Sequence, residues 1–143
     1  MARCDCSAIG YNRWLIVAGG FNGGPLDTVN MLDCEHFGQW QTLCSLPQPA
    51  YALQSIAYTR NRTIALWYLL SSSRGCGISQ NRLVYAISLQ HLVKKHGSWL
   101  VIPGPPYADS GVITMRGHLL AVGGREKHTE RKIYMYFLEH PSG

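Results

Sequence analysis

The chain has 143 residues, of which 46% are hydrophobic and 15% are charged, and its net charge is +5. This composition suits a single compact domain and excludes charge-rich disordered chains, which carry more charge and fewer apolar residues. The longest strongly apolar run, residues 64–70, is far shorter than the ~20 residues of a membrane-spanning helix, so we expect no membrane partner.

The N-terminal residues and the cysteines both predict a cytoplasmic protein. Asp5 stands where a secretory signal would have an unbroken apolar stretch. The five cysteines are an odd number and lie in or beside apolar segments, so we expect buried, reduced thiols without disulfides. The six histidines have no paired spacing that would complete a zinc site around Cys4 and Cys6. We therefore expect no metal and no cofactor.

Short apolar runs predict strands along most of the chain. In the first third they cover residues 4–9, 15–18, 29–33 and 40–43. Comparable runs occupy residues 84–88 and 133–137. All are rich in β-branched and aromatic residues and are soon followed by Gly, Pro, Ser or Asn, which favours strands over helices.

The sequence predicts one short helix over residues 89–96. Leu89, Leu92 and Val93 would share one face of it. Gly97 is expected to end the helix.

Comparison of the chain with itself reveals a repeat. Residues 46–51, Leu-Pro-Gln-Pro-Ala-Tyr, align with residues 102–107, Ile-Pro-Gly-Pro-Pro-Tyr, and the same shift carries Arg60 onto Arg116. Such self-similarity at a fixed period is the mark of a repeat architecture.

Glycine pairs and tryptophans extend this repeat. Residues 14–20 and 118–124 align, both end in Gly-Gly, and a strand-like run follows each pair at the same distance. Glycine suits a position with positive φ where two backbones come close together. Trp40 and Trp99 precede the two proline turns, and we expect both to fill the space between neighbouring sheets.

This pattern, repeated after about fifty residues, resembles the kelch repeat of β-propellers. The resemblance implies an all-β, kelch-type β-propeller fragment made of four-stranded antiparallel blades. Blade 1 would cover about residues 3–46, blade 2 about 47–102, and blade 3 about 103–143 without its last strand. The middle unit departs from the pattern, because Tyr68 and Leu69 replace the glycine pair.

Two blades and most of a third form an incomplete ring. Propellers protect their strand edges by closing a ring of about four to eight blades, whereas an open arc exposes apolar faces and unpaired edges. The chain is then a piece of a longer propeller, a truncated product, or a protomer that closes the ring as a homo-oligomer. We favour the fragment.

The resemblance also implies a non-catalytic protein–protein interaction module. In kelch-like propellers, the loops between the second and third strands and between blades gather on one face and form a partner-binding surface. Here those loops would cover residues 21–28, 71–81 and 125–131, with 47–51 and 103–109 beside them. Surface loops on a rigid scaffold carry function, and the candidate partner-binding residues are Phe21, Asn22, Asp27, Tyr51, Ser72, Arg74, Gln80, Tyr107, Asp109, Arg125 and His128. Family members recruit substrates to ubiquitin ligases or bind cytoskeletal proteins, so the resemblance implies a protein partner of either kind.

Two other classes of function are weighed against this one. The eight carboxylates are scattered, and the chain has no nucleophile elbow or phosphate-binding loop, so we expect no catalytic residues. The alternative is a fragment of a catalytic kelch-type propeller enzyme whose active residues lie in missing blades. Nucleic acid is not expected as a partner, because the basic clusters near Lys94 and Arg125 are small and Glu126 dilutes the second one.

Overall fold

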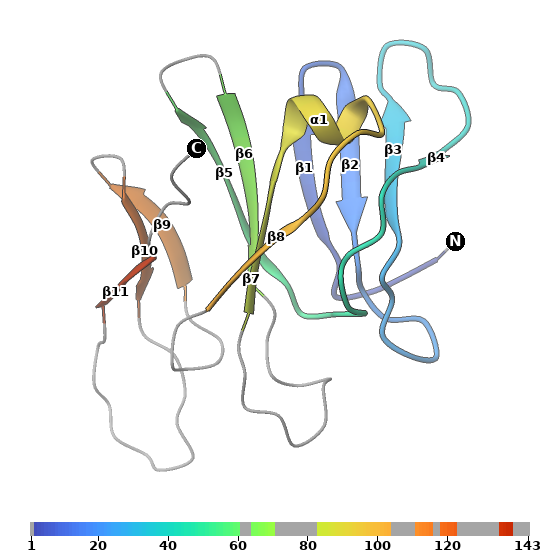
Figure 1. The fold of residues 1–143 in the computed structure, drawn as a ribbon. Helices are drawn as coiled ribbons and strands as arrows, with labels where there is room; N and C mark the ends of the chain where they lie inside the picture. Colours follow the sequence, from blue (N-terminus) through green and yellow to red (C-terminus); the bar gives the residue numbers. More distant parts are fainter. Residues whose placement is uncertain are drawn as a thin grey trace.

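The computed structural model describes residues 2–60, 64–70, 83–103, 111–115, 118–122 and 135–138. These residues form eleven strands and one short helix, and the strands make three antiparallel sheets (Figure 1). The expected all-β class is therefore confirmed. In the described part of the chain, the single helix is too short to cross a membrane.

The first sheet contains β1 (Ser7–Tyr11), β2 (Trp14–Ala18), β3 (Val29–Asp33) and β4 (Gln41–Thr42), in that order. Each strand pairs with the next one along the chain. Asn12, at φ 52°, helps to form the tight turn between β1 and β2, since asparagine tolerates a positive φ better than most residues.

Of the four strands expected in this region, only β3 has its predicted limits, and β2 begins one residue earlier than expected, at Trp14. The strand expected over residues 4–9 begins only at Ser7, because Asp5 has φ 52°, which interrupts an extended backbone. Cys4 instead forms an isolated bridge with Phe21. The fourth strand is limited to the two residues that pair with Asn30 and Met31.

The second sheet contains β5 (Gln54–Arg60), β6 (Ile64–Leu70), β7 (Leu83–Ser88) and β8 (Leu100–Pro103), again in chain order. Its four strands also form a meander. The apolar run 64–70 is thus a central strand with a paired neighbour on either side.

The helix α1 (Leu89–Val93) lies between β7 and β8. It was predicted, but it ends three residues earlier than expected. Lys95, at φ 57°, and Gly97, at φ 132°, turn the chain away from the helical conformation.

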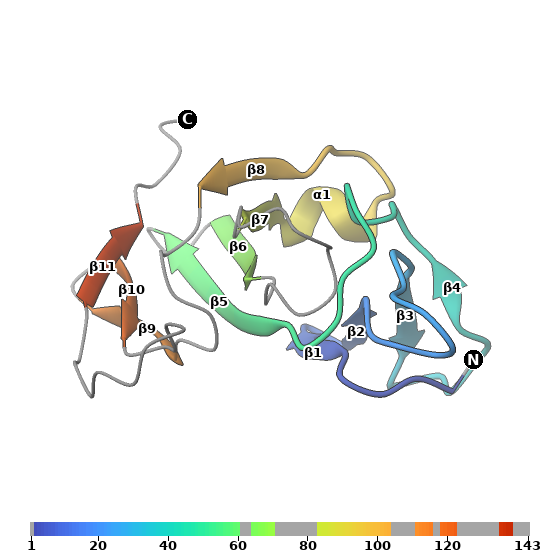
Figure 2. The same cartoon turned by 90° about the horizontal axis from the view of Figure 1, so that it is seen from below.

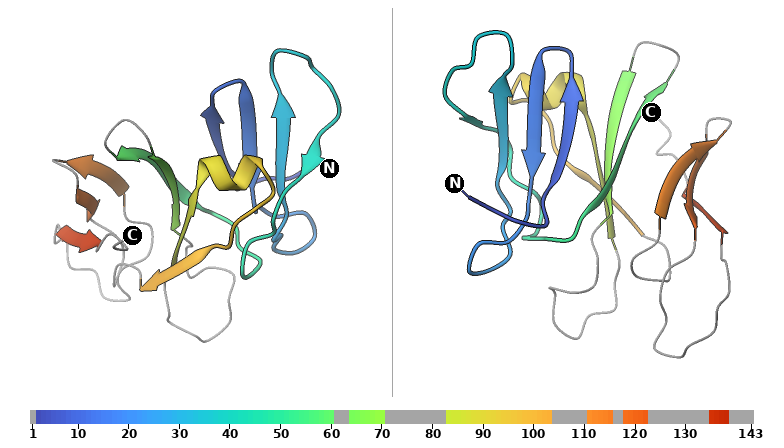
Figure 3. Two further views of the ribbon diagram at one scale, coloured as in Figure 1. Left: turned by 45° about the horizontal axis from the view of Figure 1, so that its top comes forward. Right: turned by 180° about the vertical axis from the view of Figure 1, so that it is seen from behind.

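The third sheet contains β9 (Gly111–Met115), β10 (His118–Val122) and β11 (Met135–Leu138), with β10 in the centre. The three sheets follow one another in space in the order of the sequence (Figures 2 and 3). β5 contacts β1 on one side and β9 on the other. None of the three sheets, as far as the structure describes them, closes on itself.

The main hydrophobic core joins the first sheet to the second. Strands alternate their side chains between two faces, and one face of β2 and β3 enters this core together with side chains from the β4–β5 connection, the second sheet and α1. Its members are Ile16, Ala18, Val29, Met31, Leu43, Leu46, Ala50, Leu53, Trp67, Tyr85, Ile87, Leu89 and Leu92.

The tryptophans only partly follow the prediction. Trp99 packs against the core as expected: its ring centre lies 6.1 Å from that of Trp67, and its Nε1 donates a hydrogen bond to Cys44 O at 3.5 Å. The prediction for Trp40 is wrong, because this side chain is 49% exposed. Trp67, which the repeat did not single out, is fully buried.

The expected burial of the cysteines is also wrong. Cys4 and Cys34 are exposed, and Cys6 and Cys44 are half-buried, although all four are free thiols as expected. These residues belong to connecting segments and not to the faces of strands that enter the core. Cys76 lies outside the described residues.

Candidate functional site

The β2–β3 loop, the β4–β5 connection and the N-terminal segment are joined by backbone hydrogen bonds at one end of the first sheet. Gly20 N donates to Ala50 O at 2.8 Å, and Ala50 N donates to Leu26 O at 3.0 Å. Cys4 and Phe21 exchange two further bonds of 3.1 and 2.8 Å. The three segments therefore hold one another in place.

Gly19 and Gly20 permit this close approach. Their φ angles are 63° and 106°. A Cβ atom on Gly19 would lie 2.6 Å from Ala50 O, and one on Gly20 would lie 2.8 Å from Cys4 O. The role expected for this first glycine pair is thus confirmed, both in its positive φ and in the contact between backbones. The second pair lies outside the described residues.

Four of the predicted partner-binding residues, Phe21, Asn22, Asp27 and Tyr51, lie on these joined segments, which meet at the same end of the sheet (Figure 1). Phe21 and Tyr51 form an edge-to-face pair with ring centres 5.4 Å apart, and Phe21 remains 37% exposed. Asn22 is exposed, whereas Asp27 and Tyr51 are half-buried. We call these four residues the loop surface.

The other predicted partner-binding residues lie outside the described residues. They are Ser72, Arg74, Gln80, Tyr107, Asp109, Arg125 and His128.

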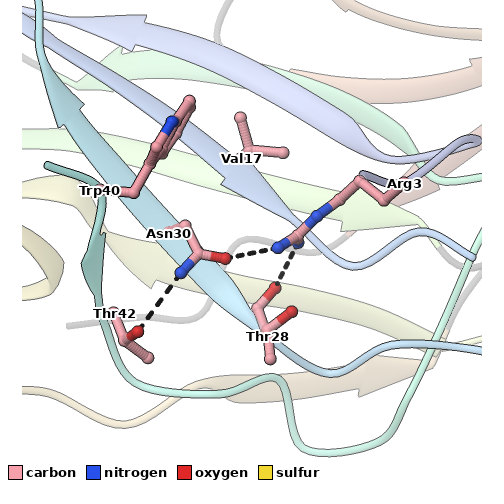
Figure 4. A pocket seen from close by; sticks show the side chains of 6 residues that line it. All are labelled: Arg3, Val17, Thr28, Asn30, Trp40 and Thr42. Carbon is pink, nitrogen blue, oxygen red and sulfur yellow. Dashed lines mark hydrogen bonds between the residues drawn. The ribbon is translucent and has the colours of Figure 1, made fainter. Parts of the chain in front are cut away.

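A cavity of about 360 Å³ occupies the opposite face of the first sheet from the core (Figure 4). Val17 pairs with Asn30, and Asn30 pairs with Thr42, so these three side chains share one face. We call this cavity the Arg3 pocket, and its lining residues are Arg3, Val17, Thr28, Asn30, Trp40 and Thr42.

The Arg3 guanidinium is held at one side of this pocket by three acceptors. Its Nη1 donates to Gly19 O at 3.1 Å and to Thr28 O at 3.2 Å, and its Nη2 donates to Asn30 Oδ1 at 2.5 Å. Asn30 Nδ2 in turn donates to Thr42 Oγ1 at 3.4 Å. Figure 4 shows the chain of contacts from Arg3 through Asn30 to Thr42.

Sequence reasoning missed the Arg3 pocket. The only signal available was the alternation in β2 and β3, which places Val17 and Asn30 out of phase with the buried residues. That pattern indicates that Val17 and Asn30 lie on the face of the sheet opposite the core. It does not show that Arg3, which belongs to the N-terminal segment, contacts the same face.

A cluster of charged residues lies near the β3–β4 loop, at the other end of the first sheet. Arg13 Nη2 lies 2.6 Å from Asp33 Oδ2, and His36 Nδ1 lies 3.3 Å from the same oxygen. Partial desolvation acts to raise the pKa of Asp33, but the backbone N–H groups of Glu35 and His36, together with Arg13, outweigh it and lower the pKa below its ordinary value. The arrangement stabilises the turn after β3.

The described residues include no group of three or more His, Cys, Asp or Glu side chains that could hold a metal ion. No family model matches the chain, and no curated protein matches its sequence.

Proposed function

We propose that the chain is a non-catalytic protein-binding module of the kelch-propeller type, and that it contacts a protein partner through the loop surface. The observation that carries the proposal is the Phe21–Tyr51 pair, which is partly exposed at the end of a sheet and lies on segments joined by backbone hydrogen bonds. Aromatic side chains are enriched at the centres of protein interfaces.

Rigidity of the loop surface supports binding. A loop that is already ordered loses less conformational entropy when a partner binds than a loop that must order at that moment. The bonds from Gly20 to Ala50 and from Phe21 to Cys4 hold the aromatic pair in this way.

The succession of three antiparallel sheets in chain order is compatible with propeller blades, and the repeat in the sequence supports this interpretation. On that basis the partner is a protein of the kinds that the family resemblance implies, a ubiquitin-ligase substrate or a cytoskeletal protein.

The proposal is tested by site-specific photo-crosslinking in a cell extract. A benzophenone amino acid is placed at Asn22, within the loop surface, or at Phe37, which is 80% exposed in the β3–β4 loop at the other end of the sheet. We expect a defined protein to crosslink from position 22 and not from position 37.

Competition makes the experiment specific. Excess unlabelled wild-type chain should abolish the crosslink, whereas a Phe21→Ala/Tyr51→Ala chain should compete at least about tenfold less well, because interface aromatics contribute about 2 kcal/mol or more each. Equal crosslinking from both positions, or equal competition by the double variant with its fold intact by circular dichroism, would contradict the proposal.

A further inference from the structure

We propose that the Arg3 pocket binds a small carboxylate that carries a flat apolar group. The pocket lies on the outer face of the first sheet and is distinct from the loop surface, so this inference does not depend on the proposed function. Three features of its lining support it: an unpaired positive charge, a buried hydroxyl without a partner, and an exposed aromatic wall.

The positive charge belongs to Arg3. The guanidinium is half-buried, and its three acceptors, Gly19 O, Thr28 O and Asn30 Oδ1, are all neutral. No carboxylate of the described chain lies within 4.0 Å of it; the ion pairs found there involve Arg13 and His36. A guanidinium has five N–H donors in a planar fork, so donors remain for an anion in the pocket. A partly buried charge gains most from an opposite charge that reaches it.

The hydroxyl without a partner belongs to Thr28. Its Oγ1 is buried and has no hydrogen-bond partner among the described residues. Buried polar atoms are normally satisfied, so an unsatisfied one in the lining of a cavity indicates a missing partner. A hydroxyl can donate to an anion, and Thr28 and Arg3 line the same cavity.

The aromatic wall is Trp40. Its side chain is 49% exposed although it lines the cavity together with Val17. Figure 4 shows the indole and Val17 on the side of the pocket away from Thr28. A ligand whose acidic group reaches Arg3 would thus place an apolar body against Trp40, where an aromatic ring stacks well.

The size and charge of the pocket define the ligand class. A cavity of about 360 Å³ lies at the lower end of the range for small-molecule sites. Arg3 is its only basic residue, beside neutral Thr28, Asn30 and Thr42. One positive charge matches a carboxylate with its single negative charge better than a phosphate monoester, which carries about −1.5 to −2 at pH 7. Planar carboxylates also fit the guanidinium fork in a bidentate manner.

The test is a titration of the whole chain with benzoate and with benzamide, followed by the NMR signals of the indole N–H groups. The chain has four tryptophans, and Trp40→Phe assigns the relevant signal. We expect benzoate to shift the Trp40 signal with a Kd of about 1 mM or lower. Benzamide has the same ring without the charge and should bind at least about tenfold more weakly.

Variants separate binding from folding. Thr28→Val keeps the shape of the side chain and the backbone carbonyl that accepts from Arg3, so it should fold and bind benzoate about tenfold more weakly. Arg3→Gln should abolish binding. Arg13→Gln, which removes an exposed arginine of the Asp33 cluster, is the matched control and should bind benzoate as the wild type does.

Further probes identify the source of the carboxylate. If acetyl-Gly-Phe with a free carboxylate binds as well as benzoate while its amide does not, the pocket takes the C-terminus of a peptide; if only benzoate binds, it takes a free small acid. Either result supports a carboxylate site. Equal binding of benzoate and benzamide, tighter binding of inorganic phosphate, an unchanged Trp40 signal, or full affinity in the folded Thr28→Val variant would overturn it.

Discussion

Gly19 and Gly23 lie close together in the chain and can be compared directly, because they have similar backbone conformations in different surroundings. Both have positive φ, 63° and 71°, but only Gly19 lies against other atoms: its Cβ position is 2.6 Å from Ala50 O, whereas that of Gly23 has nothing within 4 Å. Backbone strain alone and strain combined with a steric clash can therefore be separated by two substitutions.

We expect Gly23→Ala to lower the free energy of unfolding by about 1 kcal/mol, since it introduces only the left-handed conformation. Gly19→Ala should lower it by about 3 kcal/mol or more, because the clash with Ala50 adds to the same strain. Urea denaturation of both variants measures the difference. Equal losses would mean that the contact between the β2–β3 loop and the β4–β5 connection is unimportant for stability.

Asp33 gives a prediction about pH. Its pKa in the folded chain is below the ordinary value of 3.8, so the ionised carboxylate stabilises the fold above that pH. The contribution is lost as the pH falls from 3.8 through the lowered value. Asp33→Asn should thus be less stable than wild type near pH 6, and the gap should narrow below pH 3.8.

Denaturant unfolding at several pH values tests this expectation. Glu35→Gln is the control, because Glu35 is 64% exposed and lies 3.8 Å from Arg13, and such exposed pairs contribute little. A gap between wild type and Asp33→Asn that stays constant down to pH 3 would show that the ionisation of Asp33 does not stabilise the turn.

Single residues also show what sequence reasoning could and could not find. The role of the glycine pair at Gly19 was predictable, because a glycine pair indicates a positive φ and a close approach of two backbones. The exposure of Trp40 was not: a tryptophan is usually core, and only the position of its neighbours in space shows that no described core residue covers it.

At the scale of elements, α1 depends on its packing. Helices of five residues are not stable alone in water, but Leu89 and Leu92 of α1 are almost fully buried in the core that joins the first two sheets. Leu92→Ala should therefore lower the free energy of unfolding by about 2–5 kcal/mol.

His91 supplies the control for this substitution, since it is an exposed residue on the same helix. His91→Ala should change stability by less than about 0.5 kcal/mol. Thermal or denaturant unfolding gives both values. Similar effects of the two substitutions would show that α1 does not pack on the core in solution.

Strand spans were predictable where the pattern of residue types was strong. Val29–Asp33 was predicted at its observed limits, and the strand expected over residues 84–88 begins one residue earlier, at Leu83, because both runs are rich in residues that favour strands. Ends were less predictable: the limits of β1 and β4 depend on Asp5 and on pairing to β3, which residue type alone does not reveal.

At the scale of the whole molecule, the outer face of the first sheet matters most. The strand register places Ala8, Leu15, Val17 and Leu32 on the face opposite the core. In the described part of the chain the core lies only on the other face. An apolar face of this kind favours association, so we expect the isolated chain to form oligomers at high concentration.

Light scattering coupled to gel filtration measures the oligomeric state of the chain. Leu32→Lys should shift the chain toward the monomer. Leu100→Lys, at a 43% exposed position of β8, should leave the distribution unchanged. A single monomeric species at all concentrations would contradict the expectation. The Arg3 pocket lies on the same face, so its ligand is best titrated in dilute, monomeric samples.

The three sheets are made of strands in chain order, but the way the sheets pack could not be predicted from the sequence. The core that joins the first two sheets combines Ile16 with Trp67 and Leu92, which are far apart in the chain. The periodic pattern of residue types indicates which residues are neighbours within a sheet. Packing between sheets depends on the volumes of side chains that come into contact only in the folded chain.

The bonds between the N-terminal segment, the β2–β3 loop and the β4–β5 connection also bear on dynamics. Amide protons exchange with deuterium from the solvent only when their bonds open, and the amides of Gly20, Phe21 and Ala50 all donate to backbone oxygens of another segment. These three amides should accordingly retain their protons about as long as those of the adjoining strands do. The opening of the joined segments would then be a slow, collective event rather than the rapid fraying common in surface loops.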